Sequence, residues 1–263
     1  MVQVHTVRLA SGLDVAYVEH GDPAGRPLLL IHPWGESLGS FDRLVPLLPP
    51  TMRVLAFDQR GHGDSDKPVD GYALTDLADE VEDFMDRLGL AEAVLVGSSS
   101  GGYVAQQVAV VSPRRVTALV LVGAPRSLNG RPSFADDVER LTDPISRSWL
   151  KVSLSWFPRF HDVPDWYVED RVDDGLRMPA HVWRKAFAGL TAAVPPTEVG
   201  SITAPTLILW GDRDDLLPRD EQEQLVAAIP GSQLLVYADT GHLVLWEQPD
   251  RVAADLVDFV ERL

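Results

Sequence analysis

The chain has no cysteine among its 263 residues. That absence excludes a disulfide framework and any thiolate nucleophile. Basic residues are also scarce, because 23 Lys and Arg face 39 Asp and Glu, which gives a formal net charge of −16 at pH 7. An excess of negative charge repels phosphate backbones and anionic bilayers. We therefore expect no nucleic-acid partner and no membrane partner.

Long apolar segments are lacking too. No stretch pairs a basic start with an apolar run as a signal peptide does, and no apolar span reaches about 18 residues. We therefore expect a cytoplasmic protein. Histidine and acidic residues show no metal-site spacing, so we expect no metal and no cofactor. A hydrophobic content of 45% nevertheless suffices for one substantial core.

The hydrophobic pattern predicts short strands that alternate with helices. Residues 3–9 and 13–19 are typical of antiparallel edge strands joined at Ser11-Gly12. Six further apolar segments predict strands, at residues 28–31, 53–57, 93–97, 117–123, 206–210 and 233–237. Helical patterns such as residues 74–88 separate most of them. The alternation predicts the α/β class, with a mostly parallel, doubly wound sheet of eight strands.

This alternation stops after the sixth predicted strand, where roughly eighty residues show helix-like patches and no convincing strand. We predict that this stretch is a helical cap inserted after the sixth strand. Residues 1–124 and 204–263 would then form the core domain, and residues 125–203 the cap. Cap helices close over the carboxyl edge of such a sheet, restrict water and shape the pocket.

The predicted cap is rich in tryptophan, with Trp149, Trp156, Trp166 and Trp183. Tryptophan side chains either line an apolar substrate cavity or fill the core of a small helical subdomain. Trp149, Trp156 and Trp183 are the candidates for substrate binding, and about two of the four cap tryptophans should serve packing alone.

Residues 97–101 read Gly-Ser-Ser-Ser-Gly, which fits the pattern G-x-S-x-G of a nucleophile elbow with Ser99 at its tip. In such an elbow a strained strand-to-helix turn lifts the serine hydroxyl above the sheet edge. A predicted strand precedes the pattern and helical spacing follows it. The simpler alternative is that residues 98–100 only cap the helix, since serine is a favoured N-cap.

A serine nucleophile needs a histidine base and a carboxylate that holds the imidazole. Only His242 lies after a strand-like run, in a glycine-containing turn ahead of a C-terminal amphipathic helix. The acid should follow an earlier strand. Three carboxylates compete after the seventh predicted strand, namely Asp212, Asp214 and Asp215.

Two further motifs, after the seventh and eighth predicted strands, resemble those of a known family. Gly211, Asp214 and Pro218 fit an acid loop of the form G-x-x-D-x-x-x-P, and residues 241–249 look like a histidine loop followed by a final helix. Together with the elbow, these motifs make the chain resemble the α/β-hydrolase family over nearly its whole length. The resemblance implies that Asp214 is the acid, with Asp212 in reserve.

The same resemblance implies an oxyanion hole made of two backbone N–H groups, at Trp34 and Ser100. The family's H-G-x motif reads His32-Pro33-Trp34 in this chain. Proline in place of glycine fixes φ and removes a donor, so Trp34 must supply the N–H group. The Trp34 ring is also a candidate for substrate binding. We expect His32 to support this loop and His62, which precedes the serine in the chain, to be structural.

We predict a serine hydrolase that cleaves carboxylic esters or lactones of small, largely apolar substrates through an acyl-enzyme. Serine rather than aspartate at the elbow disfavours epoxide hydrolase and haloalkane dehalogenase chemistry. Trp34 keeps a cofactor-free perhydrolase or haloperoxidase-like activity open. Ser98 weakens the carbon–carbon bond hydrolase alternative, because those enzymes typically carry asparagine there. A ligand receptor on a hydrolase scaffold is the alternative of another class, and the sequence leaves the oligomeric state open.

Overall fold

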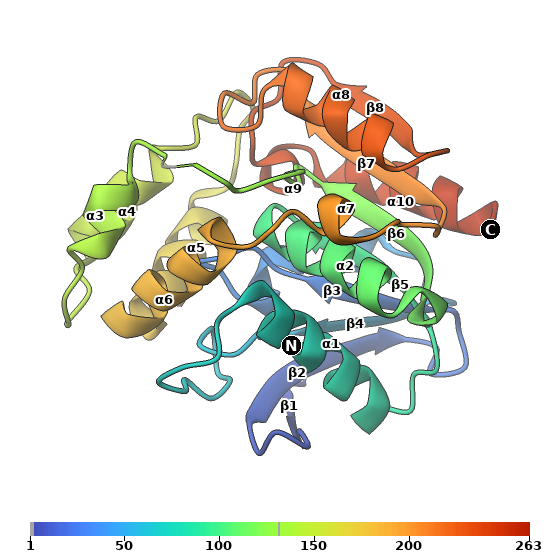
Figure 1. Cartoon of the computed structure of the whole chain (residues 1–263), viewed down its shortest axis with the longest axis horizontal. Coiled ribbons are helices and arrows are strands. Elements are labelled where there is room, and N and C mark those ends of the chain that lie inside the picture. The colour runs from blue at the N-terminus through green and yellow to red at the C-terminus, as the bar shows by residue number, and fades with distance from the viewer. Residues whose placement is uncertain (1–2, 131) are drawn as a thin grey trace.

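A computed structural model describes residues 3–130 and 132–263 (Figure 1). One sheet has the strand order β1-β2-β4-β3-β5-β6-β7-β8. The strands are β1 (His5–Arg8), β2 (Asp14–Gly21), β3 (Pro27–Ile31), β4 (Arg53–Phe57), β5 (Ala93–Ser98), β6 (Val116–Val122), β7 (Thr206–Gly211) and β8 (Gln233–Tyr237). The pairs β1–β2 and β2–β4 are antiparallel, and all the other pairs are parallel. The predicted eight-stranded, mostly parallel sheet is confirmed.

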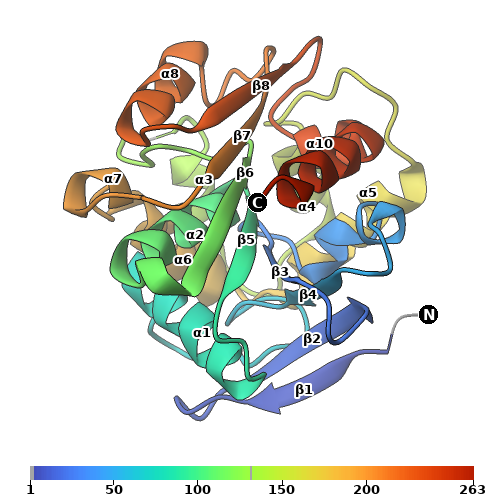
Figure 2. The same cartoon turned by 90° about the vertical axis from the view of Figure 1, so that its right-hand side faces the viewer.

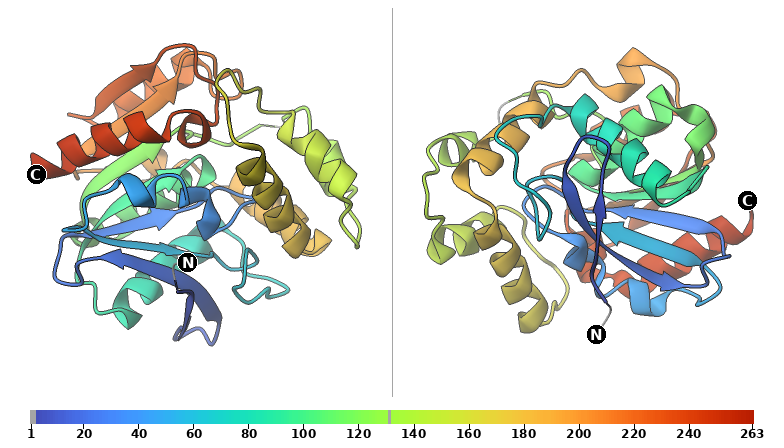
Figure 3. Two further views of the ribbon diagram at one scale, coloured as in Figure 1. Left: turned by 180° about the vertical axis from the view of Figure 1, so that it is seen from behind. Right: turned by 90° about the horizontal axis from the view of Figure 1, so that it is seen from below.

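Helices cover both faces of this sheet, as a doubly wound fold requires (Figure 2). One face carries α1, α2 and α8, and the other carries α10 with the short helices α9, η1 and η2. Their bounds are α1 (Leu74–Arg87), α2 (Ser100–Val111), α8 (Arg219–Ala228), α9 (Val244–Glu247), α10 (Pro249–Glu261), η1 (Leu38–Phe41) and η2 (Val45–Leu47), and η3 (Pro113–Arg115) follows α2. Seen from behind, α10 lies along the sheet face opposite α1 and α2 (Figure 3).

The alternation of side chains along each strand divides the core between these two faces. In β5, Leu95 packs with α1 and α2, whereas Val94 and Val96 pack with α10 and the short helices. All three side chains are fully or almost fully buried. Burying an aliphatic side chain of this size stabilises the fold by roughly 1.5–3 kcal/mol. The buried strand therefore holds the elbow, which follows it directly, on a rigid support.

The described part of the chain between β6 and β7 contains helices and no strand. The helices are α3 (Ala135–Glu139), α4 (Arg147–Leu154), α5 (Asp165–Arg177), α6 (Ala180–Thr191) and α7 (Pro196–Val199). Helices α3 to α6 gather at one end of the sheet, around a small core of their own that includes Trp183 (Figure 1). The last helix, α7, instead lies against α2 of the core. The part of the predicted cap that covers the sheet therefore ends with α6.

No helix in the described parts of the chain combines the length and the apolar character needed to cross a membrane.

Candidate active site

Ser99 stands at the turn between β5 and α2, with a φ of +48° that L-residues rarely adopt. A Cβ atom at Gly97 would lie 2.4 Å from the Cα atom of Gly102, and one at Gly101 would lie 2.2 Å from the carbonyl oxygen of Ile31. Both glycines are therefore needed for this turn to pack against its neighbours. A strained residue of this kind costs roughly 1–3 kcal/mol. The geometry is that of a nucleophile elbow rather than of a simple helix cap.

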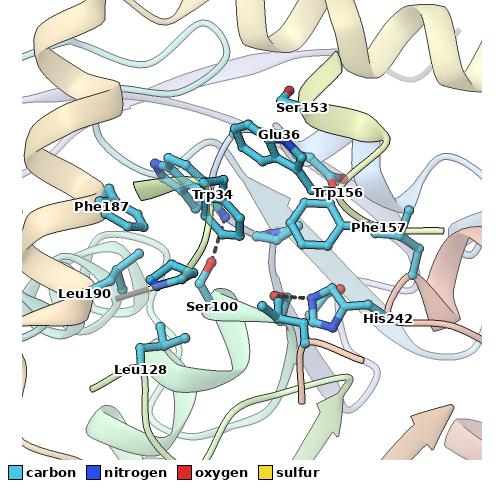
Figure 4. Close-up of a pocket in the computed structure, with 18 of the residues that line it drawn as sticks. Trp34, Glu36, Ser100, Leu128, Ser153, Trp156, Phe157, Phe187, Leu190 and His242 are labelled. Carbon is cyan, nitrogen blue, oxygen red and sulfur yellow. Dashed lines mark hydrogen bonds between the residues drawn. The ribbon is translucent and has the colours of Figure 1, made fainter. Parts of the chain in front are cut away.

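The structure brings together the three residues that the sequence analysis selected as a triad. The Oγ atom of Ser99 lies 2.9 Å from Nε2 of His242, the contact drawn as a dashed line beside His242 in Figure 4. The Nδ1 atom of His242 lies 2.8 Å from Oδ2 of Asp214. In this arrangement the imidazole can take the proton of the serine hydroxyl as the oxygen attacks a carbonyl carbon, while the carboxylate holds the imidazole in place.

Burial and backbone contacts distinguish Asp214 from its two competitors. Its side chain is buried, and its second oxygen, Oδ1, accepts hydrogen bonds of 2.9 Å from the backbone N–H groups of Leu216 and Leu217. Asp212 and Asp215 are exposed. The structure therefore places Asp214, and neither of the others, against the histidine.

The electrostatic surroundings of His242 favour its role as a base that gains a proton. Burial lowers the pKa of its imidazole, but the charge and hydrogen bond of Asp214 and the nearby charge of Glu36 raise it, and the net result is a raised pKa. An imidazolium formed during the reaction would thus be stabilised by carboxylates already in place. The ring of Phe157 lies 5.3 Å from the imidazole ring and covers it.

A carboxylate from α9 connects the histidine loop to the cap. The Oε1 atom of Glu247 accepts a hydrogen bond of 2.9 Å from the N–H group of Gly241. Its Oε2 atom accepts hydrogen bonds of 2.7 and 2.9 Å from the N–H groups of Phe160 and His161. Sequence reasoning noted Glu247 only as part of a family pattern and missed this function, because the partners at Phe160 and His161 lie far away in the chain.

The loop after β3, which the sequence analysis predicted to form part of an oxyanion hole, is held by a buried histidine. The Nδ1 atom of His32 donates to the carbonyl oxygen of Pro33 at 2.8 Å, and its Nε2 atom accepts from the N–H group of Gln59 at 3.0 Å. Burial lowers the pKa of His32 to about 4. His62, whose ring lies 4.9 Å from that of His32, has a pKa lowered to about 3. Both imidazoles are therefore neutral structural groups at pH 7.

The backbone N–H group of Trp34 faces the elbow, as expected of an oxyanion donor. It donates a hydrogen bond of 2.7 Å to the side-chain Oγ atom of Ser100, however, so a side chain already occupies the position in front of this donor (Figure 4). Ser100 is the first residue of α2, where backbone N–H groups have no partner within the helix. The sequence analysis expected two backbone donors and did not anticipate the hydroxyl between them.

A cavity of about 370 Å³ opens beside Ser99 and His242, between the sheet edge and the cap. Its walls are largely apolar, and Figure 4 shows Trp34, Trp156, Phe157, Phe187 and Leu190 around it. Trp183 also lines the cavity, with its ring 4.8 Å from that of Trp34 in an edge contact. Four tryptophans were predicted to bind substrate, and three of them, Trp34, Trp156 and Trp183, line this cavity.

Trp149 does not line the cavity. Its ring packs by its edge against Trp156 at 5.7 Å and against Trp183 at 5.2 Å, behind both of them. This placement corrects the expectation that Trp149 contacts substrate. The periodicity of a short helix does not show which of its aromatic side chains lies in the second layer.

The cavity wall also contains two charged residues that sequence reasoning missed, Glu36 and Arg171. Glu36 is 8% exposed, and burial raises its pKa to about 7, although the charge of Arg171 opposes the rise. Its Oε2 atom accepts a hydrogen bond of 2.6 Å from the hydroxyl of Ser40. Arg171 is paired with Asp174 at 2.6 Å. Within the described residues, no three His, Asp or Glu side chains are arranged to hold a metal ion.

Comparisons with known proteins agree with this fold. Residues 26–249 match the alpha/beta hydrolase fold family. The non-heme haloperoxidase of Rhodococcus erythropolis is 28% identical over 272 residues, a match that covers 97% of this chain and 98% of that protein. The 2-hydroxy-6-oxononadienedioate/2-hydroxy-6-oxononatrienedioate hydrolase 2 of Pseudomonas putida is 28% identical over 276 residues, covering 99% of this chain and 92% of that protein.

Among solved structures, a hydrolase from Pseudomonas aeruginosa superposes with a TM-score of 0.87 at 25% sequence identity, and the match covers 98% of both chains. The family match spans most of the chain, and the sheet is the eight-stranded, mostly parallel one that the sequence predicted. The chain therefore belongs to the alpha/beta hydrolase fold family.

Proposed function

We propose that this protein is a serine hydrolase that cleaves carboxylic esters or lactones of small, largely apolar molecules. The observation that carries the proposal is the chain of contacts from Ser99 through His242 to Asp214, which opens on an apolar cavity. The haloperoxidase and hydrolase relatives are compatible with acyl chemistry at such a serine, and neither identifies the substrate of this chain.

In the proposed reaction, the Oγ atom of Ser99 forms a bond to the substrate carbonyl carbon while its proton moves to Nε2 of His242. The carbonyl electron pair moves to oxygen and gives an oxyanion held at the start of α2. The carbon–oxygen bond to the alcohol then breaks, and His242 returns the proton to the leaving oxygen. Water repeats these steps on the acyl-enzyme, with His242 as its base. In a lactone the alcohol remains attached to the acyl group.

The cavity walls support the substrate class. Each methylene group buried against the aromatic and aliphatic side chains is worth about 0.8 kcal/mol of binding. A volume of about 370 Å³ suits a small ligand, since ligand pockets commonly measure about 300–1,000 Å³. The proposed substrates are therefore neutral esters and lactones of small or medium size.

The direct test is hydrolysis of p-nitrophenyl esters of increasing acyl length and of a lactone series by the purified protein. The wild-type protein should turn over members of one series, and Ser99→Ala should lose nearly all of that activity while keeping its fold. Retention of more than a few per cent of the activity in a folded Ser99→Ala protein, free of wild-type carry-over, would contradict the triad.

A second candidate, a perhydrolase, is favoured by Trp34 in the oxyanion loop and by the haloperoxidase relative at 28% identity. It shares the acyl-enzyme but releases it with hydrogen peroxide. Halogenation that depends on both hydrogen peroxide and a carboxylic acid, and that Ser99→Ala abolishes, would favour this candidate. Cleavage of carbon–carbon bonds in dienoate substrates would favour the carbon–carbon bond hydrolase alternative. Ligand-dependent partner binding without steady turnover would instead indicate a receptor.

A further inference from the structure

The side chain of Ser100 occupies an unusual position for a residue whose expected contribution is a backbone N–H group. Its Oγ atom lies 2.7 Å from the backbone nitrogen of Trp34, which donates to it. The contact joins the two segments from which an oxyanion hole would be built, the loop after β3 and the first residue of α2. Figure 4 shows it as the dashed line between Ser100 and the Trp34 segment.

The hydroxyl of Ser100 also has an unused proton. A serine hydroxyl accepts through its lone pairs and donates one hydrogen. Within the described residues, no acceptor receives a hydrogen bond from this hydroxyl. Ser100 is about 9% exposed, and it lines the cavity beside Ser99 and His242. Its proton is therefore available to a group bound in the cavity.

We propose that the Ser100 hydroxyl is itself an oxyanion donor, and that the Trp34 N–H group acts through it. This inference rests on the proposed acyl-transfer function and specifies the donors of that site. As the Ser99 oxygen bonds to the carbonyl carbon, the carbonyl electron pair moves to oxygen, and the Ser99 proton moves to His242. The new oxyanion accepts hydrogen bonds from the Oγ–H and the backbone N–H of Ser100, and both protons stay on Ser100.

Two physical arguments favour this arrangement over direct donation by Trp34. For the Trp34 N–H group to reach the oxyanion, the Ser100 side chain would have to rotate and break the 2.7 Å hydrogen bond in front of that donor. The relayed arrangement breaks no bond. A hydroxyl that accepts from an N–H group is also a stronger donor, because successive hydrogen bonds polarise one another. The fixed φ of Pro33 helps to hold the Trp34 donor in this orientation.

The test compares wild type with Ser100→Ala, Ser100→Thr and Ser100→Cys on the best ester of the hydrolysis screen. Removing an oxyanion donor typically lowers kcat by about 10²–10³-fold. Ser100→Ala should show a loss of that order with little change in KM, and Ser100→Thr, which keeps the hydroxyl, should recover most of the activity. Ser100→Cys, which keeps the size but donates weakly, should lie between them. A Ser100→Ala protein as fast as wild type, or faster, would overturn the proposal by showing that the hydroxyl only obstructs Trp34.

A matched thionoester separates donor loss from structural damage. Sulfur is a weak hydrogen-bond acceptor, so a lost oxyanion donor slows the oxygen ester more than the thionoester. We expect the ratio of kcat/KM for the oxygen ester to that for the thionoester to fall in Ser100→Ala and to recover in Ser100→Thr. Equal loss on both substrates would overturn the proposal, because distortion of the elbow slows both alike.

The failure of this inference is distinguishable from that of the proposed function. Wild-type protein that neither hydrolyses any ester or lactone nor becomes labelled at Ser99 by a fluorophosphonate, read by intact-protein mass spectrometry, would overturn the proposed function and with it this inference. Wild-type turnover and labelling with an unaffected Ser100→Ala protein would overturn the inference alone.

Discussion

At the scale of single residues, the site combines a strained serine with an imidazole held between charges. Ser99 is kept in a left-handed conformation by packing around two glycines, and His242 is held by Asp214 with Glu36 nearby. Asp214 is in turn fixed by two backbone N–H groups. Each group is therefore positioned by at least one contact that does not depend on substrate. Such preorganisation is what lets a site stabilise charge without first reorganising.

Changing Asp214 to asparagine should reduce kcat strongly. The amide keeps the shape of the carboxylate but favours the wrong imidazole tautomer, and in a comparable triad this costs about 10⁴-fold. Asp215→Asn is the matched control, because Asp215 is the next residue and is exposed. Steady-state ester hydrolysis by both variants checks the prediction. A severe loss in Asp215→Asn, or in Asp212→Asn, with a mild effect in Asp214→Asn would mean that the acid has been misassigned.

The pH profile should report the charges around His242. The imidazole must be neutral to accept the Ser99 proton, so kcat/KM rises with pH through its pKa, and the raised pKa moves this acid limb above pH 6.5. Glu36→Gln removes a carboxyl whose negative charge, which forms as pH rises through its pKa of about 7, favours the imidazolium. The pKa of His242 should fall, and the acid limb should move to lower pH.

Glu92→Gln is the control for that shift. Glu92 is exposed and lies at the amino end of β5, the opposite end from the elbow. Its profile should match that of wild type. An acid limb that stays in place in Glu36→Gln, or that moves to higher pH, would show that Glu36 does not contribute to the charge felt by His242.

At the scale of elements, the candidate active site is assembled from the ends of parallel strands, and several side chains connect it to the helical segment after β6, among them Glu247. Loops after β3, β5, β7 and β8 meet at the carboxyl edge of the sheet, where open α/β folds bind their ligands. Glu247 of α9 joins the histidine loop to the segment between α4 and α5. The carboxylate of Glu247 thus contributes both to the position of His242 and to the placement of the segment between α4 and α5.

Glu247→Ala should lower both stability and activity. The change leaves three backbone N–H groups without their acceptor, those of Gly241, Phe160 and His161. Gly241 is buried, and an unsatisfied buried polar group costs about 1–3 kcal/mol, whereas Phe160 and His161 are exposed and water can satisfy their N–H groups. Urea unfolding should show a decrease of that order, and kcat should fall because the histidine loop loses its anchor. Glu247→Gln, which keeps an oxygen acceptor, should be milder. An unchanged unfolding midpoint in Glu247→Ala would show that the hydrogen bonds of Glu247 contribute nothing to stability.

At the scale of the whole molecule, an acidic chain encloses an apolar cavity beneath a helical cap. The formal net charge is −16, and the cavity wall carries the carboxyl of Glu36 together with the guanidinium of Arg171. The aromatic side chains that face the cavity come from both the core and the cap, as Trp34 and Trp183 show by their edge contact. Substrate selection is therefore a property of the two parts together.

Substrate preference should follow from that arrangement. Along a series of neutral p-nitrophenyl esters, kcat/KM should rise with each added methylene until the cavity is filled. The increase per methylene should correspond to a gain in binding free energy of up to about 0.8 kcal/mol. Matched anionic esters should be poorer substrates, because the apolar wall removes their charge from water and Arg171 is already paired with Asp174. The check is kcat/KM across both series at one ionic strength. A flat response to acyl length, or a preference for the anionic members, would mean that the aromatic residues only hold the cap together.

The sequence by itself determined the architecture and the candidate chemistry. Continuous apolar runs specify which strands are buried on both faces, and the order of strand, elbow and helix around Ser99 depends on neighbours in the chain. His242 was selected from its place after a strand-like run, whereas the choice of Asp214 among three carboxylates came from the resemblance to the α/β-hydrolase family. These features are local, so a single sequence is enough to predict them.

Only the tertiary structure decided which side chains from distant segments meet. It placed Trp149 behind Trp156 and Trp183, moved Glu36 and Arg171 to the cavity wall, and set the Ser100 hydroxyl against Trp34. None of these contacts follows from periodicity, because each depends on how the cap and the loops pack in three dimensions. Burial also changes the chemistry of Glu36, because removal from water raises the pKa of its carboxyl to about 7.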